Sequence, residues 1–337
     1  MKAIQEIFPL LNEPRKVVIT THQKPDPDAM GSSLGLYHFL ISMGHQVTVI
    51  SPTNWASWLN WMPDADKILD FELSAQTEKA VSALNNADWL FCLDFNIFTR
   101  TRNLSPKLYD FRGTRVLIDH HQQPDEENFE YGISRTDKSS TCEMVYDFIV
   151  DSGNAEKIDL KMAECLYAGV MADTGSFRFA STTASVHTMI AALKEKGLQH
   201  SKVHENIYDN FLENRLRFTG HVLMNRMEVF YEYNATLIAI SKKDLLRFQI
   251  KTGDTEGLVN FPLSIQGIKL AALVIDRDEE RKWSFRSRGG FDTNTFARKY
   301  FNGGGHFNAS GGRSSESLDQ TVERFKQAMQ ENAEQLQ

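Results

Sequence analysis

Residues 17–32 read VVITTHQKPDPDAMGS, and this stretch joins a strand-like run, a polar turn and the start of a helix. The run VVITT is rich in β-branched apolar residues, as expected for a strand that is buried on both faces. His22, Asp26 and Asp28 follow it directly, and helical periodicity extends over about residues 29–43. An apolar strand that leads through a polar turn into a helix is the repeating unit of a parallel α/β sheet.

The same alternation continues through the first half of the chain and predicts an α/β fold, with a mainly parallel sheet flanked by helices. Helical periodicity then replaces the strand patterns, and we expect these helices to end the first domain. The strand-like runs are QVTVIS at 46–51, WLFCLDF at 89–95 and RVLIDHH at 115–121, and the helical runs are SSTCEMVYDFIV at 139–150, LKMAECLYAGVMA at 160–172 and TTASVHTMIAALKEKG at 182–197.

Strand patterns resume in the second half, after a charged helical stretch at 213–227, and they predict a second, smaller α/β domain. Two domains also follow from the length, because 337 residues exceed the roughly 150 residues of a typical domain. We expect a first domain at 1–195, a helical connector at 196–227 and a second domain at 228–337. The active site is expected in the cleft between the two domains.

Composition and charge limit the class of protein. Apolar residues make up 41% of the chain and charged residues 24%, as in a folded globular protein. The formal net charge of −7 argues against a protein that tracks along long nucleic acid, because such binding depends on many lysine and arginine contacts with phosphates. The expected partners are therefore short RNA oligonucleotides or small nucleotides.

The chain shows no sign of export or of membrane insertion. Its first residues, MKAIQEIFPLLNEPRK, carry acidic residues and a proline where an export signal has a basic region and an unbroken apolar run. Nowhere do about 18 apolar residues follow one another. Cys92, Cys142 and Cys165 lie in no metal-binding spacing and are expected to be inert thiols. We expect a cytoplasmic protein with no membrane partner, and the sequence leaves open whether it forms a homodimer.

Acidic and histidine residues follow three of the predicted strands. Because the carboxyl ends of parallel strands meet at one edge of a sheet, these side chains should lie close together. One aspartate alone has a simpler explanation, since Asp28 can be the N-cap of the helix that follows it. Several carboxylates in one crevice would repel each other without cations, and this favours a metal site. The candidate ligands are His22, Asp26, Asp28, Asp94, His120 and Asp173.

The types of ligand also restrict the metal and the reaction. Two histidines among several carboxylates, without a thiolate, suit manganese or magnesium better than structural zinc. We expect two Mn²⁺ ions, with Mg²⁺ or Co²⁺ as substitutes. Two such ions can share a carboxylate, activate water and clamp the oxygens of an in-line phosphoryl displacement. The candidate ligands therefore predict the hydrolysis of a phosphoester.

Five ordered motifs resemble those of the DHH phosphoesterase superfamily with its DHH-associated C-terminal domain. A lone Asp-His-His would be weak evidence, but five motifs in order over nearly the whole chain are specific. The length and the glycine-rich signature are similar to the group of nanoRNases and phosphoadenosine phosphate (pAp) phosphatases. The motifs are HQKPDPDAMGS at 22–32, Asp94 at its strand end, Asp-His-His at 119–121, VMADTGSFRF at 170–179 and Gly-Gly-Gly-His at 303–306 followed by ASGG.

The resemblance implies a catalytic role for particular residues. Asp94 would bridge two ions, His121 would point toward the scissile phosphate as a charge stabiliser or proton donor, and Asp119 would orient the histidines. The implied reaction is hydrolysis of short oligoribonucleotides to mononucleotides and of pAp to AMP. One ion would be held by His22, Asp26 and Asp94, and the other by Asp28, Asp94, His120 and Asp173.

Substrate phosphate is expected to meet the second domain. The glycines before His306 let backbone amides approach an anion, although a flexible turn would also explain them. Arg286 and Arg288 would share one face of a strand and could grip phosphate, with a solvated face as the alternative. Arg178 follows the Asp173 motif and could meet a base, a phosphate or a structural partner. The predicted substrate-binding residues are Arg178, Arg286, Arg288, Gly304, Gly305 and His306.

Four other functions are compatible with parts of this pattern. Cleavage of a cyclic dinucleotide, such as c-di-AMP or its linear product, would use the same metal centre. Pyrophosphatases of this type lack the glycine-rich signature, and long-strand exonucleases need an electropositive path. A non-catalytic nucleotide-binding regulator would be expected to have lost a metal ligand, but every expected ligand is present.

Overall fold

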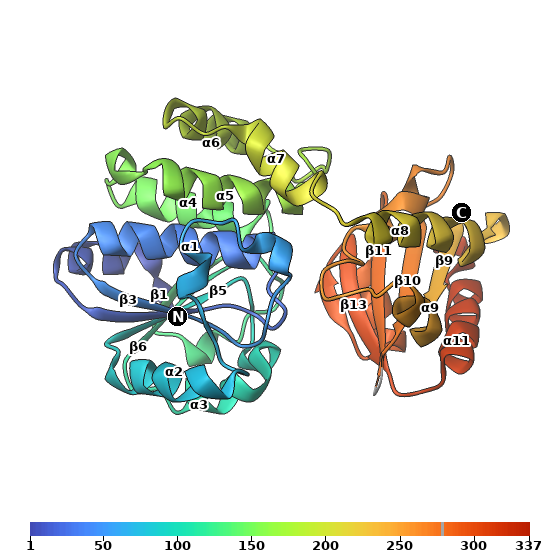
Figure 1. Cartoon of the computed structure of the whole chain (residues 1–337), viewed down its shortest axis with the longest axis horizontal. Coiled ribbons are helices and arrows are strands. Elements are labelled where there is room, and N and C mark those ends of the chain that lie inside the picture. Colours follow the sequence, from blue (N-terminus) through green and yellow to red (C-terminus); the bar gives the residue numbers. More distant parts are fainter. Residues whose placement is uncertain (278–279) are drawn as a thin grey trace. The chain divides into compact units, whose positions relative to one another are not determined.

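The computed structural model describes residues 1–277 and 280–337 (Figure 1). The chain divides into two compact units, Met1–Asn210 and Phe211–Gln337, each with its own sheet and core. No helix within the described ranges is long and apolar enough to cross a membrane. The predicted domain bounds at residues 195 and 227 remain predictions.

A seven-stranded sheet forms the centre of unit 1, and every neighbouring pair of strands in it is parallel. The strand order is β1-β7-β6-β5-β2-β3-β4, so the chain extends the sheet from β2 toward one edge and from β5 toward the other. Ligands of such sheets commonly bind where the order reverses, and here this point lies between β2 and β5. The strands are β1 Lys2–Ala3, β2 Lys16–Thr20, β3 Gln46–Ser51, β4 Leu69–Asp70, β5 Trp89–Leu93, β6 Thr114–Asp119 and β7 Tyr131–Ser134.

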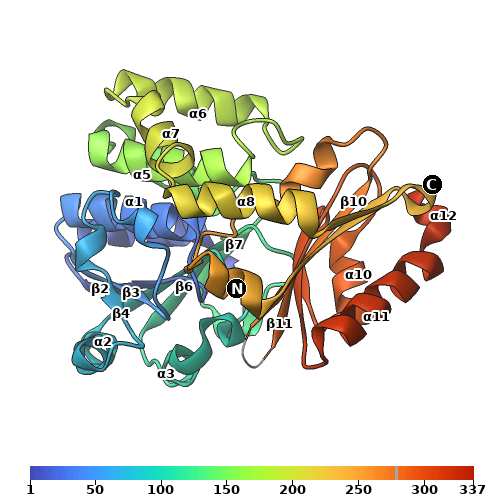
Figure 2. The ribbon, with the colours of Figure 1, turned by 45° about the vertical axis from the view of Figure 1, so that its right-hand side comes forward.

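Helices cover both faces of this sheet, as Figures 1 and 2 show. On one face α1 packs against α4 and α5, and α5 in turn contacts α6 and α7. On the opposite face lie α2 and α3. The helices are α1 Pro27–Ser42, α2 Ser74–Asn86, α3 Ser105–Tyr109, α4 Thr141–Asp151, α5 Leu160–Asp173, α6 Ala184–Glu195 and α7 His200–Tyr208.

The side chains of β2 alternate between the two cores of unit 1. Val17 and Ile19 belong to the apolar cluster on the side of α1, whereas Val18 belongs to the cluster on the side of α2. Successive side chains of a strand point to opposite faces, so an unbroken apolar run supplies both cores. Burial of each such side chain stabilises the fold by about 1.5–3 kcal/mol. The predicted parallel α/β architecture is confirmed.

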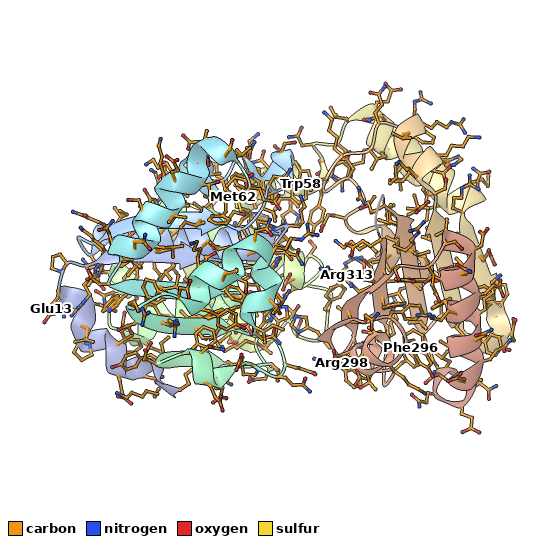
Figure 3. The ribbon with its side chains drawn as sticks, turned by 90° about the horizontal axis from the view of Figure 1, so that it is seen from below. Glu13, Trp58, Met62, Phe296, Arg298 and Arg313 are labelled. Atoms are coloured by element: carbon orange, nitrogen blue, oxygen red, sulfur yellow. The ribbon has the colours of Figure 1, made fainter. Side chains whose placement is uncertain are left out.

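Unit 2 is built on a mixed six-stranded sheet in the order β12-β13-β11-β10-β9-β8. Only β9 and β10 are parallel neighbours among the described pairs. Trp283, Phe285 and Phe296 form an aromatic core between the sheet and the helices α10 and α11. Phe296 is labelled in Figure 3. The predicted smaller α/β domain is confirmed. Its elements are α8 Glu213–Asn225, β8 Met227–Phe230, β9 Ala235–Ile240, α9 Lys242–Arg247, β10 Leu270–Asp276, β11 Arg281–Ser287, α10 Thr293–Tyr300, β12 Gly304–His306, β13 Ala309–Ser314, α11 Leu318–Glu331 and α12 Ala333–Leu336.

Candidate active site

The first group of predicted metal ligands lies at the carboxyl edge of the unit 1 sheet, where β2 and β5 end. His22, Asp26 and Asp94 each offer an atom within 4.8 Å of the others. His22 Nε2 is 3.4 Å from Asp94 Oδ2 and 3.9 Å from Asp26 Oδ2. The other ring nitrogen, Nδ1, lies 2.8 Å from the carbonyl oxygen of Gln23. This contact favours the tautomer in which Nδ1 carries the proton, so Nε2 can act as a metal ligand.

Asp26 has a second role as the N-cap of α1. Its Oδ1 accepts hydrogen bonds from the backbone amides of Asp28 and Ala29, both at 3.0 Å. The simpler explanation considered for Asp28, an N-cap, therefore does not apply, because Asp28 lies within the first turn of the helix. Asp28 is fully buried, and its carboxylate needs another explanation.

The second group contains Asp28, His120 and Asp173, whose ligand atoms also lie within 4.8 Å of one another. His120 follows β6, and its Nε2 is 3.8 Å from Asp28 Oδ2 and 3.4 Å from Asp173 Oδ2. Asp173 is the last residue of α5. The end of β6, the first turn of α1 and the end of α5 thus place an imidazole and two carboxylates around one point.

Asp94 connects the two groups. Its Oδ2 faces His22, and its Oδ1 lies 3.4 Å from His120 Nε2. The residue is 2% exposed, and its backbone has a left-handed conformation with φ of 64°. Asparagine, aspartate and glycine tolerate this conformation best. One carboxylate oxygen of Asp94 therefore faces each group of candidate ligands.

Asp119 and His121 form a buried pair beside these groups. Asp119 Oδ1 lies 2.7 Å from His121 Nδ1, so the carboxylate holds the ring in one orientation. Burial lowers the pKa of His121 well below its usual range, and the charge of Arg100 acts in the same direction, so the ring is neutral. Asp119 is fully buried, and its Oδ2 has no hydrogen-bond partner among the described residues.

The pKa values of the clustered groups are strongly shifted. Burial and the charge of Asp94 raise the pKa of Asp28 to about 7, and burial with the neighbouring carboxylates raises that of Asp173 well above its usual range. Burial alone would lower the pKa of His120, but its hydrogen bond to Asp94 and the nearby carboxylates raise it to about 10. Burial would raise the pKa of Asp94, yet the hydrogen bonds from His120 and His22 hold it well below its usual range.

These shifts show that the buried cluster has an excess of negative charge that protons balance in the metal-free protein. Divalent cations would displace those protons, since carboxylate oxygens and imidazole nitrogens bind metal in their deprotonated forms. The unpaired Asp119 Oδ2 and the hard oxygen and nitrogen donors fit a site for Mn²⁺ or Mg²⁺. The residues present therefore fit a divalent metal centre.

Unit 2 places two predicted substrate-binding side chains in one row across its sheet. His306 of β12 pairs with Ala309 of β13, which pairs with Arg286 of β11. Opposed residues of neighbouring strands point to the same face, so the imidazole and the guanidinium flank a small alanine. All three residues are partly exposed. Arg288 lies just beyond the end of β11 and is exposed.

Two of the three glycines before His306, Gly303 and Gly305, are required by close packing of the backbone. A Cβ at Gly303 would come within 1.9 Å of the carbonyl oxygen of Gly311, and Gly305 has a φ of 150°. The amide of Gly305 donates to Asn294 Oδ1 at 3.0 Å, and the Nε of Arg298, labelled in Figure 3, donates to the same oxygen at 3.1 Å. Gly304 lies beside this guanidinium, since a Cβ built on it would be 3.6 Å from the Nε of Arg298. Arg298 was not among the predicted substrate-binding residues.

Arg178 is exposed and lies in a strained turn after Asp173. Gly175, Ser176 and Phe177 have positive φ angles of 57°, 60° and 64°. Such conformations are unfavourable for serine and phenylalanine and often occur near functional sites. The Nε of Arg178 donates to the carbonyl oxygen of Gly175 at 2.6 Å, which ties the side chain to its own turn.

Two family matches cover most of the chain. Residues 16–170 match the DHH family, N-terminal domain, and residues 234–335 match the DHHA1 domain. The chain belongs to the DHH family. The DHH match lies in unit 1 and contains every predicted metal ligand except Asp173, which follows it, and the DHHA1 match contains the glycine-rich signature at 303–306. This DHH protein is a phosphoesterase, a hydrolase that acts on phosphoester bonds, and its family is metal-dependent.

Relatives of this DHH phosphoesterase match it over most of its length. An exopolyphosphatase-related protein from Bacteroides fragilis has 37% sequence identity and a TM-score of 0.92, with 98% of this chain and 97% of that chain covered. The probable bifunctional oligoribonuclease and PAP phosphatase NrnA of Streptococcus mutans is 27% identical, over 93% of this chain and 94% of the relative. The NrnA protein of Bacillus subtilis, named a bifunctional oligoribonuclease and PAP phosphatase, is also 27% identical, over 88% of each.

Sequence analysis missed the first turn of α4 as part of the DHH site. The amides of Thr141 and Cys142 donate to the two oxygens of Asp28 at 2.7 Å and 2.9 Å, and the hydroxyl of Thr141 donates to Asp94 Oδ1 at 3.0 Å. A helix N-terminus stabilises a carboxylate in this way. The sequence contained one signal, because Ser140 is a typical N-cap before a helical run.

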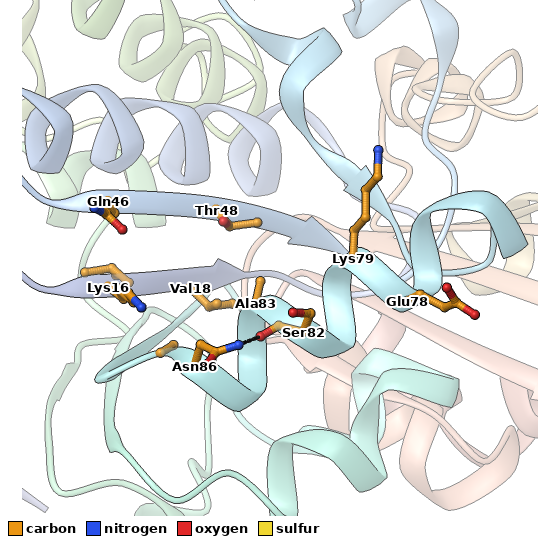
Figure 4. A pocket seen from close by; sticks show the side chains of 11 residues that line it. Lys16, Val18, Gln46, Thr48, Glu78, Lys79, Ser82, Ala83 and Asn86 are labelled. Carbon is orange, nitrogen blue, oxygen red and sulfur yellow. Dashed lines mark hydrogen bonds between the residues drawn. The ribbon is translucent and has the colours of Figure 1, made fainter.

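A large groove lies at the other end of the DHH sheet, where β2 and β3 begin (Figure 4). Its volume is about 640 Å³, and α2 forms one wall. None of the predicted site residues lines it, and its charged side chains are exposed. The lining residues are Lys16, Val17, Val18, Gln46, Thr48, Glu78, Lys79, Ser82, Ala83, Asn86 and Ala87.

Proposed function

We propose that this DHH phosphoesterase hydrolyses short oligoribonucleotides to mononucleotides, and pAp to AMP, with two divalent metal ions of which Mn²⁺ is the preferred one. The observation that carries this proposal is the cluster of carboxylates and imidazoles around Asp94. The names of the S. mutans and B. subtilis relatives support the substrates. The net charge of −7 favours short substrates over long strands.

The same cluster supports an assignment of ligands to the two ions. When bound, the ions would lower the pKa of water and stabilise negative charge on the phosphate. Asp94 is the candidate for the shared ligand, because its two oxygens face different groups. One site would use His22, Asp26 and Asp94, and the other would use Asp28, Asp94, His120 and Asp173.

His121, held by Asp119, would transfer the proton in the reaction. With Nδ1 of His121 donating to Asp119, the opposite nitrogen, Nε2, carries the lone pair. A neutral imidazole in this state can take up a proton and return it to the departing oxygen. The buried carboxylate of Asp119 would stabilise the imidazolium while it exists.

The partly exposed row of Arg286, Ala309 and His306 in unit 2 would hold other phosphates of the substrate. Arg286 offers a planar guanidinium that can bind a phosphate with two hydrogen bonds, and His306 lies on the same face across Ala309. Oligonucleotides and pAp both carry a phosphate besides the one that is cleaved, so one binding row can serve both substrates.

Hydrolysis of a labelled RNA ladder from two to twenty nucleotides tests the proposal, with pAp, c-di-AMP and polyphosphate alongside, in Mn²⁺ and in chelator. Polyphosphate is included because the B. fragilis relative is named for an exopolyphosphatase. We expect turnover of the shortest RNAs and of pAp in Mn²⁺ only. Turnover of the cyclic dinucleotide or polyphosphate alone would replace the substrate and retain the metal centre, and turnover in chelator would refute the metal mechanism.

A further inference from the structure

Arg100 lies on the loop that follows Asp94 and was not among the predicted site residues. It belongs to the 3₁₀ segment Phe98–Leu104, between β5 and α3. The amide of Gln23 donates to the carbonyl oxygen of Arg100 at 2.8 Å, and the Nε of Arg102 donates to Gln23 Oε1. The backbone hydrogen bond from Gln23 holds the loop against the turn that begins with His22, at the edge of the sheet where the metal ligands lie.

The charge of Arg100 reaches several residues of the site. Burial is the main cause of the lowered pKa of His121, and the Arg100 charge is the next largest cause. The same charge also acts to lower the pKa of His22, after burial, the hydrogen bond to Asp94 and the charge of Asp26, and it acts to lower that of Asp119, after burial and the charges of Asp94 and His120. The half-buried guanidinium therefore lies within electrostatic reach of residues that follow both β2 and β6.

The guanidinium of Arg100 has no acceptor within the described part of the chain. No carboxylate of residues 1–277 or 280–337 lies within 4.0 Å of it, and the hydrogen bonds that Arg100 makes with these residues come from its backbone. Two other arginines of unit 1 differ, because Arg102 donates to Gln23 and Arg178 donates to Gly175. The guanidinium is half-buried, so its N–H donors can reach solvent and are available to the acceptor oxygens of a ligand.

We propose that Arg100 binds a nonbridging oxygen of the phosphate group that is hydrolysed in unit 1. This inference rests on the proposed function and deepens it. A guanidinium matches the geometry of phosphate oxygens, and a fixed positive charge beside the phosphoryl group stabilises the negative charge on its oxygens in the transition state. Arg100 would thus add to the catalytic unit a phosphate contact that depends on neither Arg286 nor His306.

Three variants test this role: Arg100→Gln, Arg100→Lys and, as a matched control on the same loop, Arg102→Gln. Orthophosphate binding to the Mn²⁺-loaded protein is measured by calorimetry, Mn²⁺ binding is measured separately, and hydrolysis of an RNA trinucleotide is followed by its kcat and KM. Arg102 is exposed and its guanidinium already has an acceptor, so it reports on the loop without the proposed contact.

We expect Arg100→Gln to weaken orthophosphate binding about 10- to 100-fold, as for loss of a charged hydrogen bond, and to lower kcat/KM by at least as much. Arg100→Lys should recover part of the loss, and Arg102→Gln should stay within about twofold of the parent. If Arg100→Gln does not fold, the lysine variant must still weaken orthophosphate binding.

Three results would overturn the role of Arg100. The first is parent-like orthophosphate binding by Arg100→Gln or, if that variant does not fold, by Arg100→Lys. The second is an equal loss of orthophosphate binding in Arg102→Gln. The third is a loss of Mn²⁺ affinity large enough to explain the weaker orthophosphate binding. Failure of the parent protein to cleave RNA or pAp would instead refute the proposed function, and the orthophosphate comparison would still decide whether Arg100 binds phosphate.

Discussion

The two ends of the unit 1 sheet differ in where they keep their charges. At the carboxyl end, Asp28 and Asp94 are 0% and 2% exposed and lie among imidazoles with shifted pKa values. At the amino end, the groove of about 640 Å³ is lined by Lys16, Glu78 and Lys79, which are all exposed. Solvated charges cost the fold little, whereas buried charges cost several kcal/mol unless they are compensated. Buried and mutually shifted charges therefore mark the site better than the size of a hollow.

Neutralising Asp94 should have the largest effect, and it tests whether the buried charges at the carboxyl end of the sheet form the active site. Asp94→Asn keeps the size of the side chain but removes the charge that both ligand groups share, so kcat/KM should fall on the order of 10³-fold or more. Kinetics in Mn²⁺, with a thermal melt to show that the variant is folded, check this result. Substantial remaining activity would refute a centre built around Asp94.

Arg286→Ala tests the proposed phosphate contact in unit 2. The loss of a phosphate contact made equally in the ground and transition states should raise KM about 10-fold or more and leave kcat nearly unchanged. Lys282→Ala is the matched control, because Lys282 lies on the same strand and is exposed. A fall in kcat without a change in KM would contradict a role in binding.

The stability of the metal-free protein should depend on pH because of the buried charges. The pKa of His120 is raised from its usual 6.5 to about 10, so its contribution to stability is fully present below pH 6.5 and is lost as the pH rises toward 10. At most, this one proton changes the free energy of unfolding by about 1.4 kcal/mol per pH unit.

Thermal melts in chelator between pH 6.5 and 9.5 measure this effect, and we expect Tm to fall as the pH rises. Mn²⁺ should remove or reverse the trend, because it displaces the protons that the cluster binds. His120→Asn should flatten the curve recorded in chelator. An unchanged slope in this variant would show that other groups cause the dependence.

Lys79→Ala in the groove should have the smallest effect. The side chain is exposed, so its removal should change stability by less than about 0.5 kcal/mol and leave kcat/KM within about twofold of the parent. A large loss of activity would show that the groove serves the reaction and would remove the contrast between the two ends.

Local sequence patterns carried enough information to predict the fold and to nominate the residues of the site. VVITT, WLFCLDF and RVLIDHH are apolar runs that end in polar residues, and parallel pairing brings such ends to one edge. His22, Asp94 and His120 therefore meet for a reason that is visible in the sequence.

Contacts between distant segments could not be predicted from those patterns. Thr141 donates to Asp28 across 113 residues, and nothing near either residue specifies the other. The choice between Asp26 and Asp28 as N-cap also depended on the exact start of α1 at Pro27. Arg100 resembles any loop arginine in the sequence, and only the three-dimensional structure shows that no described residue supplies an acceptor to its guanidinium.

The left-handed backbone at Asp94 restricts how this protein can drift in evolution. Glutamate keeps the charge but is poorly suited to that conformation, whereas asparagine and glycine fit the backbone and lack the carboxylate. No replacement is conservative in both respects. A descendant chain that had become a nucleotide-binding regulator should therefore carry asparagine or glycine at this position and keep an otherwise intact fold.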